Sequence, residues 1–583
     1  MLAPAASASA AGRPFEFSGV IEGSYGPTWS HADRMSAIRW MARQGLDTYI
    51  HAPKFDAYQR AQWRDPYPSE AMAEFADEIR LARRLGSAWV PNVSPGTPLI
   101  PGPPGGPAVS RDVCFACPED VAVLIGKLEP FFRAGARTLM VSFDDVQKVS
   151  THPEDAARYG TDGAAYGRMT RDVLNTVQRH FQREAGRERL RLVTVLADYS
   201  GTADTDYLRA VRSEGGLDPA IVVTWTGTVV VAPTIRAVDA AAYARLVGRR
   251  RVGIWDNYPA NDYTGNAVGR PSRLFLGPYR GRDPLLSTAV SGIVANVMNQ
   301  ATANRFALGT MARYVADPRR YDPDVAWRAV IADLGRSRGL ADALAALAEN
   351  SRSSALDRRE SIEFSAARDA FLAALATPFW PSPYDALARD LARQQRAAAM
   401  IRAGAPELAA QVAPFLERLA AEAGTARAIA EALAAQRPRL DVRVLRPARG
   451  PIAVEGRAAA PSPGDVAAAL ATAASGHAAD LADSHVVHGD RVTPGLSDPQ
   501  TVGSLYINEN RVDAFFAEVV SRTAAWSPTA AAAVGGITVT LDGHPVAIGA
   551  DGTFRLTLSP RSGRHTLLAT DGAGNKTGVR ITG

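Results

Sequence analysis

Eight short apolar runs, separated by stretches of helical periodicity, constrain the fold of this 583-residue chain most strongly. Each run is typical of a strand buried in a parallel sheet. The runs cover residues 19–23, 48–51, 88–92, 139–145, 190–196, 221–225, 251–255 and 292–296. Eight strands with helices between them predict an α/β fold of the (β/α)8 type, the TIM barrel. A doubly wound sheet is the alternative, because the count of eight favours a barrel without proving it.

Polar or aromatic residues stand where each of these runs stops. The positions include Glu22, His51, Asn92, Asp144, Asp145, Asp198, Trp225, Asp256 and Asn296. Because the C-terminal ends of barrel strands meet on one face, we expect these side chains around one rim, where such barrels carry active sites. Taken singly, the aromatic residues at this rim fit ordinary packing. Together with hydroxyl and amide groups they favour a sugar pocket, since a sugar ring has apolar faces and a polar edge.

The adjacent acids Asp144 and Asp145 are the sharpest feature of the rim. Burying two carboxylates at the end of an apolar strand costs folding free energy unless they are paired or used in chemistry. A turn or a helix N-cap is the alternative interpretation, because aspartate favours both.

The rest of the chain has a different character. Residues 301–436 are rich in Ala, Leu, Arg and Glu with helical spacing, which predicts a scaffolding helix bundle. Alternating apolar residues and Asp-Gly turns near the C-terminus predict a small spacer sandwich. The predicted parts are a flexible segment 1–14, a catalytic barrel 15–305, an α-helical domain 306–526 with helices at 466–482 and 511–525, a Pro/Arg-rich linker or insertion near 437–465 inside that domain, and an Ig-like β-sandwich 527–583.

Charge and hydropathy exclude two classes of partner. The net charge is only +5 and no basic block occurs, so we expect no nucleic acid. No run of 18 apolar residues occurs, so we expect no membrane insertion. The small residues of segment 1–10 are similar to the end of a signal peptide, and we expect an exported bacterial protein, secreted or at the cell surface, whose leader has been removed.

The two cysteines, Cys114 and Cys117, form a single C-x-x-C motif. One such pair is weak evidence for a zinc site, which needs four ligands. The pair also follows a Pro/Gly-rich loop rather than the strand that a redox motif requires. We interpret it as a chance pair, and the sequence leaves open whether a disulfide forms. No metal and no cofactor is expected.

Several segments in one order resemble the family 84 glycoside hydrolases, the β-N-acetylglucosaminidases that include O-GlcNAcase. They are 19–30, 48–54, 63–68, 142–145, 199–202, 225–227 and 255–263, and the likeness covers residues 17–300 closely. Ser24 stands where the family has an aromatic residue and Thr228 where it has a proline. These departures leave the preference for the leaving group open.

The resemblance implies a retaining exo-hydrolase that uses its own substrate as the nucleophile. The 2-acetamido oxygen of the sugar attacks C1, and water opens the resulting oxazoline, an exception to the two-carboxylate scheme. By this resemblance Asp144 orients the acetamido N–H, and Asp145 is first the general acid and then the general base. Asp145 must then hold a proton near neutral pH, for which we expect burial and the nearby Asp144 to raise its pKa.

The resemblance also implies contacts to the sugar hydroxyls. Gly23 contributes its backbone, Lys54 donates to one hydroxyl, Asp262 accepts from the 4- and 6-hydroxyls, and Asn296 contacts the 3- or 4-hydroxyl. Without the resemblance, we would interpret Lys54 as a solvated charge and the asparagine as a strand-end cap.

The acetamido group and the leaving group have their own implied contacts. Tyr199 donates to the acetamido oxygen, Asn257 contacts the acetamido group, Trp255 closes its pocket, and Val230 approaches the leaving group. The expected substrates are glycans or glycoproteins with terminal β-linked N-acetylglucosamine. The alternatives are an N-acetylgalactosaminidase of the same mechanism and a carbohydrate-binding protein without turnover.

Overall fold

The computed structural model describes residues 13–96, 112–264 and 272–447 except 360, and then 450–472 and 537–582 with short gaps. The chain divides into two compact units. Among the described residues, the first unit holds the chain up to Leu334 together with Ser351–Arg358, and the second holds the remainder. Segment 1–12 and most of the predicted helices 466–482 and 511–525 lie outside the described residues. Within the part described, no helix is long and apolar enough to cross a membrane.

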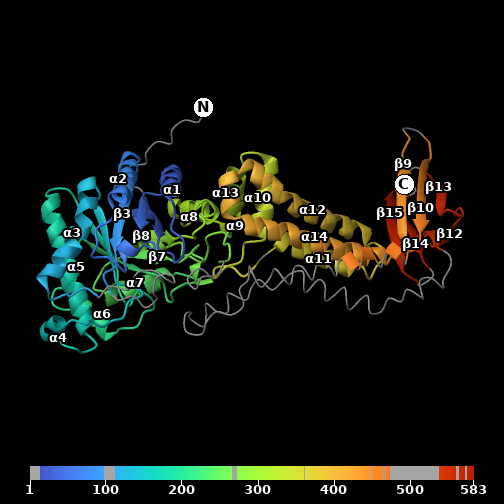
Figure 1. Cartoon of the computed structure of the whole chain (residues 1–583). Coiled ribbons are helices and arrows are strands. Elements are labelled where there is room, and N and C mark those ends of the chain that lie inside the picture. The colour runs from blue at the N-terminus through green and yellow to red at the C-terminus, as the bar shows by residue number, and fades with distance from the viewer. Residues whose placement is uncertain are drawn as a thin grey trace. The chain divides into compact units, whose positions relative to one another are not determined.

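Eight parallel strands close into a barrel in the first unit (Figure 1). The ring closes where β1 pairs with β8, with Phe17 opposite Gly292. The strands are β1 Phe17–Glu22, β2 Thr48–His51, β3 Ala88–Val93, β4 Thr138–Ser142, β5 Arg191–Val195, β6 Ile221–Trp225, β7 Val252–Asp256 and β8 Val290–Asn296. The predicted TIM barrel is therefore confirmed, and the doubly wound alternative is wrong.

Helices between the strands surround the barrel. They are α1 His31–Arg43, α2 Ser69–Arg84, α3 Pro118–Ala134, α4 Pro153–Tyr159, α5 Ala165–Ala185, α6 Asp206–Arg212 and α7 Ala237–Leu246, and α8 Arg305–Ala316 and α9 Pro323–Gly335 follow β8. Helix α1 begins at a capping box, in which Ser30 and Asp33 bond each other's backbone N–H. Buried side chains of seven strands, among them Ile21, Met140 and Val294, fill the barrel interior, so it is a packed core and not a pore.

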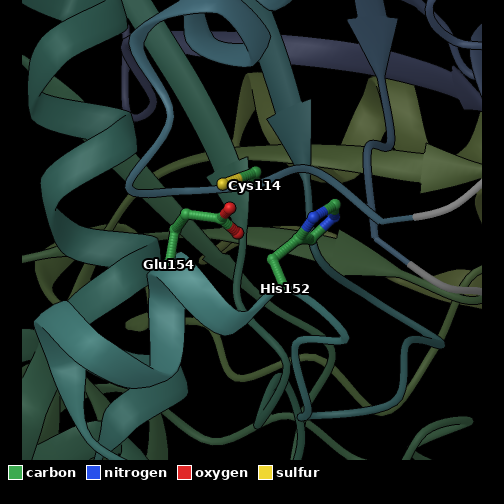
Figure 2. A group of neighbouring side chains, drawn as sticks. All are labelled: Cys114, His152 and Glu154. Atoms are coloured by element: carbon green, nitrogen blue, oxygen red, sulfur yellow. The ribbon is translucent and has the colours of Figure 1, made fainter.

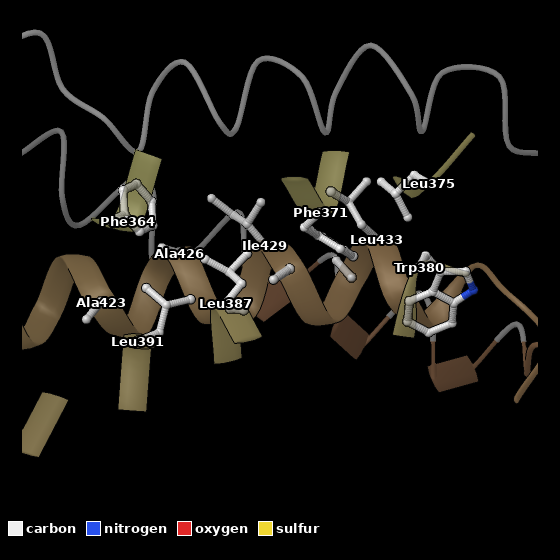
Figure 3. Packing of buried hydrophobic residues seen from close by; sticks show 13 residues of the cluster. Phe364, Phe371, Leu375, Trp380, Leu387, Leu391, Ala423, Ala426, Ile429 and Leu433 are labelled. Carbon is white, nitrogen blue, oxygen red and sulfur yellow. The ribbon is translucent and has the colours of Figure 1, made fainter. Parts of the chain in front are cut away.

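A helical layer with an apolar core forms part of the second unit. Its helices are α10 Arg338–Glu349, α11 Ile362–Ala374, α12 Pro381–Gly404, α13 Pro406–Gln411 and α14 Ala413–Ala435. Phe371, Leu387 and Ile429, from three of these helices, pack in one cluster and are fully buried (Figure 3). The predicted helical character of this region agrees with the structure up to residue 435.

Two antiparallel sheets end the chain, and they share one hydrophobic core. One sheet has the order β13-β10-β9 and the other β12-β11-β14-β15. The strands are β9 Arg439–Leu445, β10 Ile452–Ala459, β11 Thr538–Leu541, β12 His544–Val546, β13 Thr553–Leu558, β14 Arg564–Thr570 and β15 Lys576–Thr582.

The Pro/Arg-rich segment near 437–465 is therefore not a linker or an insertion in a helical domain. It supplies β9 and β10, and β10 pairs with β13 far along the chain. Leu440 is buried, and Val442 and Val444 pack against the same core, while Asp441 and Arg443 alternate with them. This period of two is the signature of a half-buried strand, which the proline and arginine content concealed. The sandwich therefore begins near residue 439 and not at 527.

Candidate active site

Asp144 forms a buried ion pair with Lys54. Asp144 follows β4 and Lys54 follows β2, and the Lys54 ammonium group donates to Asp144 Oδ2. The same ammonium lies over the Trp255 ring, 5.4 Å from its centre. Asp144 Oδ1 is also buried, but no group within the described ranges hydrogen-bonds to it. A buried acceptor without a donor costs folding free energy, so this oxygen is a place where a ligand N–H would be favoured.

Asp145 has a different set of partners. The Tyr25 hydroxyl donates to Asp145 Oδ2 at 2.9 Å, and the Tyr199 hydroxyl donates to Oδ1 at 2.7 Å. Arg60 donates to the Tyr25 oxygen at 3.0 Å and to the Asp145 backbone carbonyl at 3.2 Å. The backbone at Asp145 is left-handed, with φ of 51°, a conformation that aspartate tolerates better than most residues. The adjacent carboxylates therefore face separate groups.

The pKa of Asp145 differs from the expectation. Burial raises it, but the Lys54 and Arg60 cations and the two tyrosine hydroxyls together hold the pKa below its ordinary value. The expected raised pKa is therefore wrong for this arrangement, because Lys54 already pairs with the neighbouring Asp144. Burial raises the pKa of both tyrosines, Tyr25 and Tyr199, so both hydroxyls stay protonated as donors.

A hydrogen-bonded chain joins the other predicted binding residues. Asn296 Oδ1 accepts from the Gly23 N–H at 3.1 Å, and Asn296 Nδ2 donates to Asn257 Oδ1 at 3.0 Å. Asn257 Oδ1 also accepts from Trp255 Nε1 at 2.9 Å, and its Nδ2 donates to the Val230 carbonyl at 2.7 Å. A Cβ at Gly23 would lie 2.7 Å from the Trp255 ring, so only glycine fits there. The chain joins the ends of β1, β7 and β8.

Asp262 lies on the short 3-10 helix Asp262–Thr264 after β7. It accepts the backbone N–H of Tyr25 at 2.7 Å and of Tyr263 at 2.9 Å. Burial raises the pKa of Asp262 to about 6, although these two N–H groups oppose the shift. Tyr25 thus bonds Asp262 through its backbone and Asp145 through its hydroxyl. The structure therefore joins the predicted residues in linked groups, and Val230 is the exposed member at 37%.

Arg60 is a site residue that the sequence did not reveal. It follows the 3-10 helix Ala57–Gln59 and is 4% exposed. Burying a guanidinium requires partners, and here they are Tyr25 and Asp145, one of them 85 positions away. The only signal available was the proximity of Arg60 to Lys54 in one predicted rim loop.

His51, predicted as a rim residue, is buried next to the loop that carries Lys54. Its Nδ1 lies 3.6 Å from Glu22 Oε2 and its Nε2 lies 3.3 Å from Asp56 Oδ2. Burial lowers the pKa of His51, but the hydrogen bond to Asp56 and the nearby negative charge of Glu22 overcome this effect and raise the pKa to about 9. An imidazolium therefore links the end of β1 to the loop that carries Lys54.

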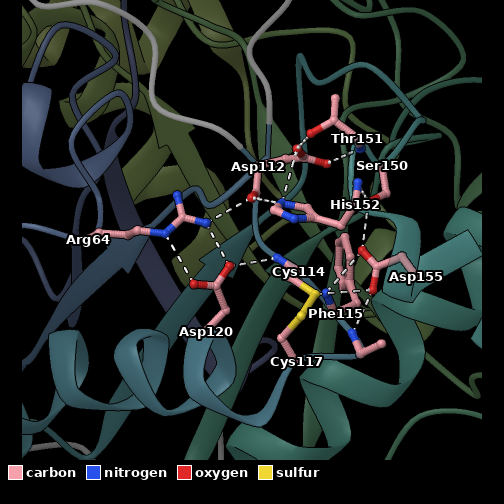
Figure 4. The surroundings of a disulfide bond; sticks show 11 residues. Arg64, Asp112, Cys114, Phe115, Cys117, Asp120, Ser150, Thr151, His152 and Asp155 are labelled. Carbon is pink, nitrogen blue, oxygen red and sulfur yellow. Dashed lines mark hydrogen bonds and ion pairs between the residues drawn. A yellow bond between two sulfur atoms is a disulfide. The ribbon is translucent and has the colours of Figure 1, made fainter.

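Cys114 and Cys117 form a disulfide (Figure 4). The interpretation as a chance pair is wrong, because the cysteines lie close enough to bond at the start of α3. Asp155 of α4 accepts the N–H groups of Phe115 at 3.1 Å and Ala116 at 2.6 Å. The segment that carries the disulfide, before α3, is thus hydrogen-bonded to α4. The loop that leads from β4 to α4 carries Asp144 and Asp145.

Comparison with known proteins settles the family. Residues 18–349 match the family described as NAGidase, beta-N-acetylglucosaminidase. The chain belongs to this family. It is 29% identical over 317 residues to Protein O-GlcNAcase of Rattus norvegicus, and this match covers 53% of the present chain and 31% of the rat protein. It is also 29% identical over 302 residues to the Mus musculus protein of the same name, and that match covers 51% of the present chain and 29% of the mouse protein. The resemblance to family 84 glycoside hydrolases is confirmed.

Solved structures share the fold over most of the chain. A mutant of the O-GlcNAc hydrolase of Thermobaculum terrenum has a TM-score of 0.67 and 23% identity, and the match covers 88% of this chain and 95% of that one. The structure titled CpGH84B has a TM-score of 0.62 and 21% identity, over 87% and 77% of the two chains. The matches extend beyond the barrel into the C-terminal part of the chain.

Proposed function

We propose that this chain is a retaining exo-β-N-acetylglucosaminidase that uses the acetamido group of its substrate as the nucleophile. Membership of the β-N-acetylglucosaminidase family supports the reaction class. The observation that carries the proposal is the state of Asp144: Lys54 occupies Oδ2, while Oδ1 is buried with no hydrogen-bond partner among the described residues. A single N–H donor would satisfy that oxygen, as an acetamido group provides.

The first step uses Asp144 and Tyr199. The acetamido N–H donates to Asp144 Oδ1, which favours the positive character that the nitrogen gains as the acetamido oxygen attacks C1. Tyr199 donates its hydroxyl to that oxygen and holds it near C1. The product of this step is an oxazoline, which water opens with retention of configuration.

Asp145 moves the proton in both steps. Its pKa is held low while both tyrosine hydroxyls donate to it. A phenol has one proton to donate, so a Tyr199 hydroxyl that turns to the acetamido oxygen leaves Asp145 Oδ1. The loss of this donor raises the pKa of Asp145 when substrate binds. The carboxyl then holds the proton that it gives to the leaving oxygen.

The remaining groups would select the sugar. Asp262 accepts from the 4- and 6-hydroxyls, and Asn296, Lys54 and the Gly23 backbone complete the hydroxyl contacts. Asn257 and Trp255 border the acetamido pocket, and their mutual hydrogen bond fixes the indole edge. Val230, which is partly exposed, lies on the side of the leaving group. Asp262 and Asn296 are the positions that would distinguish the equatorial 4-hydroxyl of N-acetylglucosamine from the axial one of N-acetylgalactosamine.

Paired kinetics on chromogenic β-N-acetylglucosaminide and β-N-acetylgalactosaminide test the proposal. We expect turnover of the first in preference to the second, and inhibition by a thiazoline that mimics the oxazoline. A protein that binds N-acetylglucosamine in calorimetry but turns over neither substrate would be a carbohydrate-binding protein and would contradict the proposal. Preference for the galacto substrate would keep the mechanism and correct the sugar.

The natural substrates and the location extend the same proposal. The relatives named Protein O-GlcNAcase suggest N-acetylglucosamine on proteins, and free glycans with the same terminal sugar are the second class. The Cys114–Cys117 disulfide supports a secreted or cell-surface location, since disulfides persist in oxidising compartments. Release of N-acetylglucosamine from modified proteins and from oligosaccharides compares the substrates. Fractionation of the source cells tests the location, and recovery only from the cytosol would contradict it.

A further inference from the structure

Three side chains of the types that bind metal ions lie close together (Figure 2). They are Cys114, from the loop before α3, and His152 and Glu154, at the start of α4. One ligand atom of each lies within 4.8 Å of the ligand atoms of the other two. Cys117 Sγ is a fourth donor at the same place, because it is bonded to Cys114 Sγ. The set of two sulfurs, one imidazole and one carboxylate is a zinc ligand set, which the sequence alone did not predict.

The hydrogen bond of His152 to the backbone leaves one ring nitrogen available to a metal ion. His152 Nε2 lies 2.7 Å from the backbone carbonyl oxygen of Asp112. A carbonyl can only accept, so Nε2 carries the proton and the lone pair of the neutral ring is on Nδ1. A ring N–H given to a backbone carbonyl is the arrangement that orients metal-binding histidines. Asp112 is fixed in turn, because its Oδ1 accepts from the Thr151 hydroxyl at 2.8 Å.

The two loops are held together independently of the S–S bond (Figure 4). Asp155 accepts from Phe115, Ala116 and the Ser150 hydroxyl, the last at 2.6 Å. The Cys114 N–H donates to Asp120 Oδ2 at 2.8 Å, and Arg64 anchors Asp120. Breaking the disulfide therefore leaves the donors in place. Glu154 is exposed and makes no hydrogen bond or ion pair to another described residue, so its carboxylate can turn to a cation.

We propose that reduction of the disulfide converts this cluster into a tetrahedral Zn²⁺ site with Cys114, Cys117, His152 and Glu154 as ligands. A dithiol supplies two electrons and two protons: the S–S bond breaks, each sulfur becomes a thiol, and the dithiol closes to its own disulfide. Zn²⁺ then displaces both thiol protons to solvent as two Zn–S bonds form. In the oxidised chain, the disulfide holds the turn 114–117 together. In the reduced chain, the metal ion would hold this turn and would also link it to α4.

Zinc titration of the oxidised and the reduced full chain tests this proposal. The chain is reduced with dithiothreitol, desalted without oxygen, and titrated with Zn²⁺ alone against a colorimetric chelator. We expect one tight Zn²⁺ per reduced chain and none per oxidised chain. Co²⁺ in place of Zn²⁺ should give the thiolate-to-metal charge-transfer band and the strong visible bands of a tetrahedral site. Weak octahedral Co²⁺ bands without charge transfer would overturn the proposal.

Variants separate this site from adventitious binding. His152→Ala should weaken Zn²⁺ binding more than about tenfold, since loss of an outer partner alone costs that much. His180→Ala, on α5, is the matched control and should bind Zn²⁺ as the wild type does. Glu154→Gln should weaken binding, and the exposed Glu184→Gln should not.

A cysteine variant guards against effects on folding. Cys117→Ser has no disulfide in any redox state, and we expect a native circular dichroism spectrum with loss of the thiolate–Co²⁺ band intensity. Equal Zn²⁺ affinity in wild type, His152→Ala and Cys117→Ser would overturn the proposal. A disulfide that is reduced only when the chain unfolds would overturn it as well.

Discussion

The rim of the barrel and the helical core of the second unit bury different kinds of side chain: charged ones at the rim and apolar ones in the helical core. Lys54, Arg60, Asp144 and Asp262 are all under 9% exposed, and each buried charge at the rim needs its own partner. The cluster formed by α11, α12 and α14 consists of apolar residues, whose burial is favourable without any partner of matching charge. A substitution at the rim therefore changes chemistry, whereas one in the helical cluster changes stability.

The largest effect is expected from the two acids. Asp144→Asn keeps the shape but removes the charge that favours oxazoline formation, so kcat/KM should fall by about 10²–10⁴-fold for all leaving groups. Asp145→Asn should cause a similar loss with poor leaving groups and a smaller one with good ones, which need little protonation. Stopped assays with aryl glycosides of graded leaving-group pKa measure both. Asp162→Asn, on an exposed loop, is the control, and equal sensitivity of both variants to the leaving group would contradict the assigned roles.

A substitution in the helical core should lower the stability of the fold and leave the catalytic rate unchanged. Phe371→Ala empties a fully buried position and should lower the free energy of unfolding by about 3–5 kcal/mol. The kcat/KM of the folded enzyme should stay unchanged, because no rim charge is altered. Urea unfolding followed by circular dichroism measures the first, and a rate assay below the transition measures the second. Met400→Ala, at a site 39% exposed, should change stability by less than about 0.5 kcal/mol. A lower kcat/KM in folded Phe371→Ala would break the contrast.

His51 is an exception to this contrast, because it is a charged residue at the rim that contributes to the stability of the fold. Its pKa is about 9 in the folded chain, above the ordinary value of 6.5. The imidazolium therefore stabilises the fold fully below about pH 6.5, and this contribution disappears as pH rises to about 9. The lost stability is on the order of 3 kcal/mol. Denaturant unfolding at pH 6 and pH 9 measures it, with His51→Gln as the comparison. A wild type and a variant with the same pH slope would contradict the assignment.

The smallest effect is expected at Tyr25, where one hydroxyl tunes the pKa of an acid. Tyr25→Phe removes a donor to Asp145, so the pKa of Asp145 should rise toward its ordinary value. The alkaline limb of kcat/KM should then move to higher pH by about one unit, the worth of one hydrogen bond to a charged group. Tyr58→Phe is the matched control. A shift in the opposite direction would show that Asp145 does not set this limb.

The sequence was sufficient for the barrel because its signal is local. Each buried strand is an apolar run, and the proposed functional groups Asp144 and Lys54 lie within three residues of the end of such a run. The partners of these groups depend on contacts between distant segments. Arg60 contacts Asp145 across 85 positions, and β10 pairs with β13 across about a hundred, so neither pairing leaves a pattern within one segment.

The pKa of Asp145 illustrates the same limit in energetic terms. Adjacent acids suggested mutual repulsion and hence a raised pKa. The structure surrounds them with Lys54, Arg60 and two phenols, which reverse the sign. The disulfide is similar, because two cysteines three positions apart bond only when the turn between them brings their sulfurs together. Composition and spacing do not determine that turn.

The left-handed backbone at Asp145 restricts which side chains can stand there at all. Asparagine and glycine share this conformation readily, whereas alanine and β-branched residues are strained in it. An alanine substitution would thus distort the loop and remove the proposed proton donor at once, and only Asp145→Asn separates the two effects. The same restriction limits which residues can replace Asp145 without disturbing the fold. A natural descendant that binds sugar without cleaving it would therefore be expected to carry asparagine or glycine at this position.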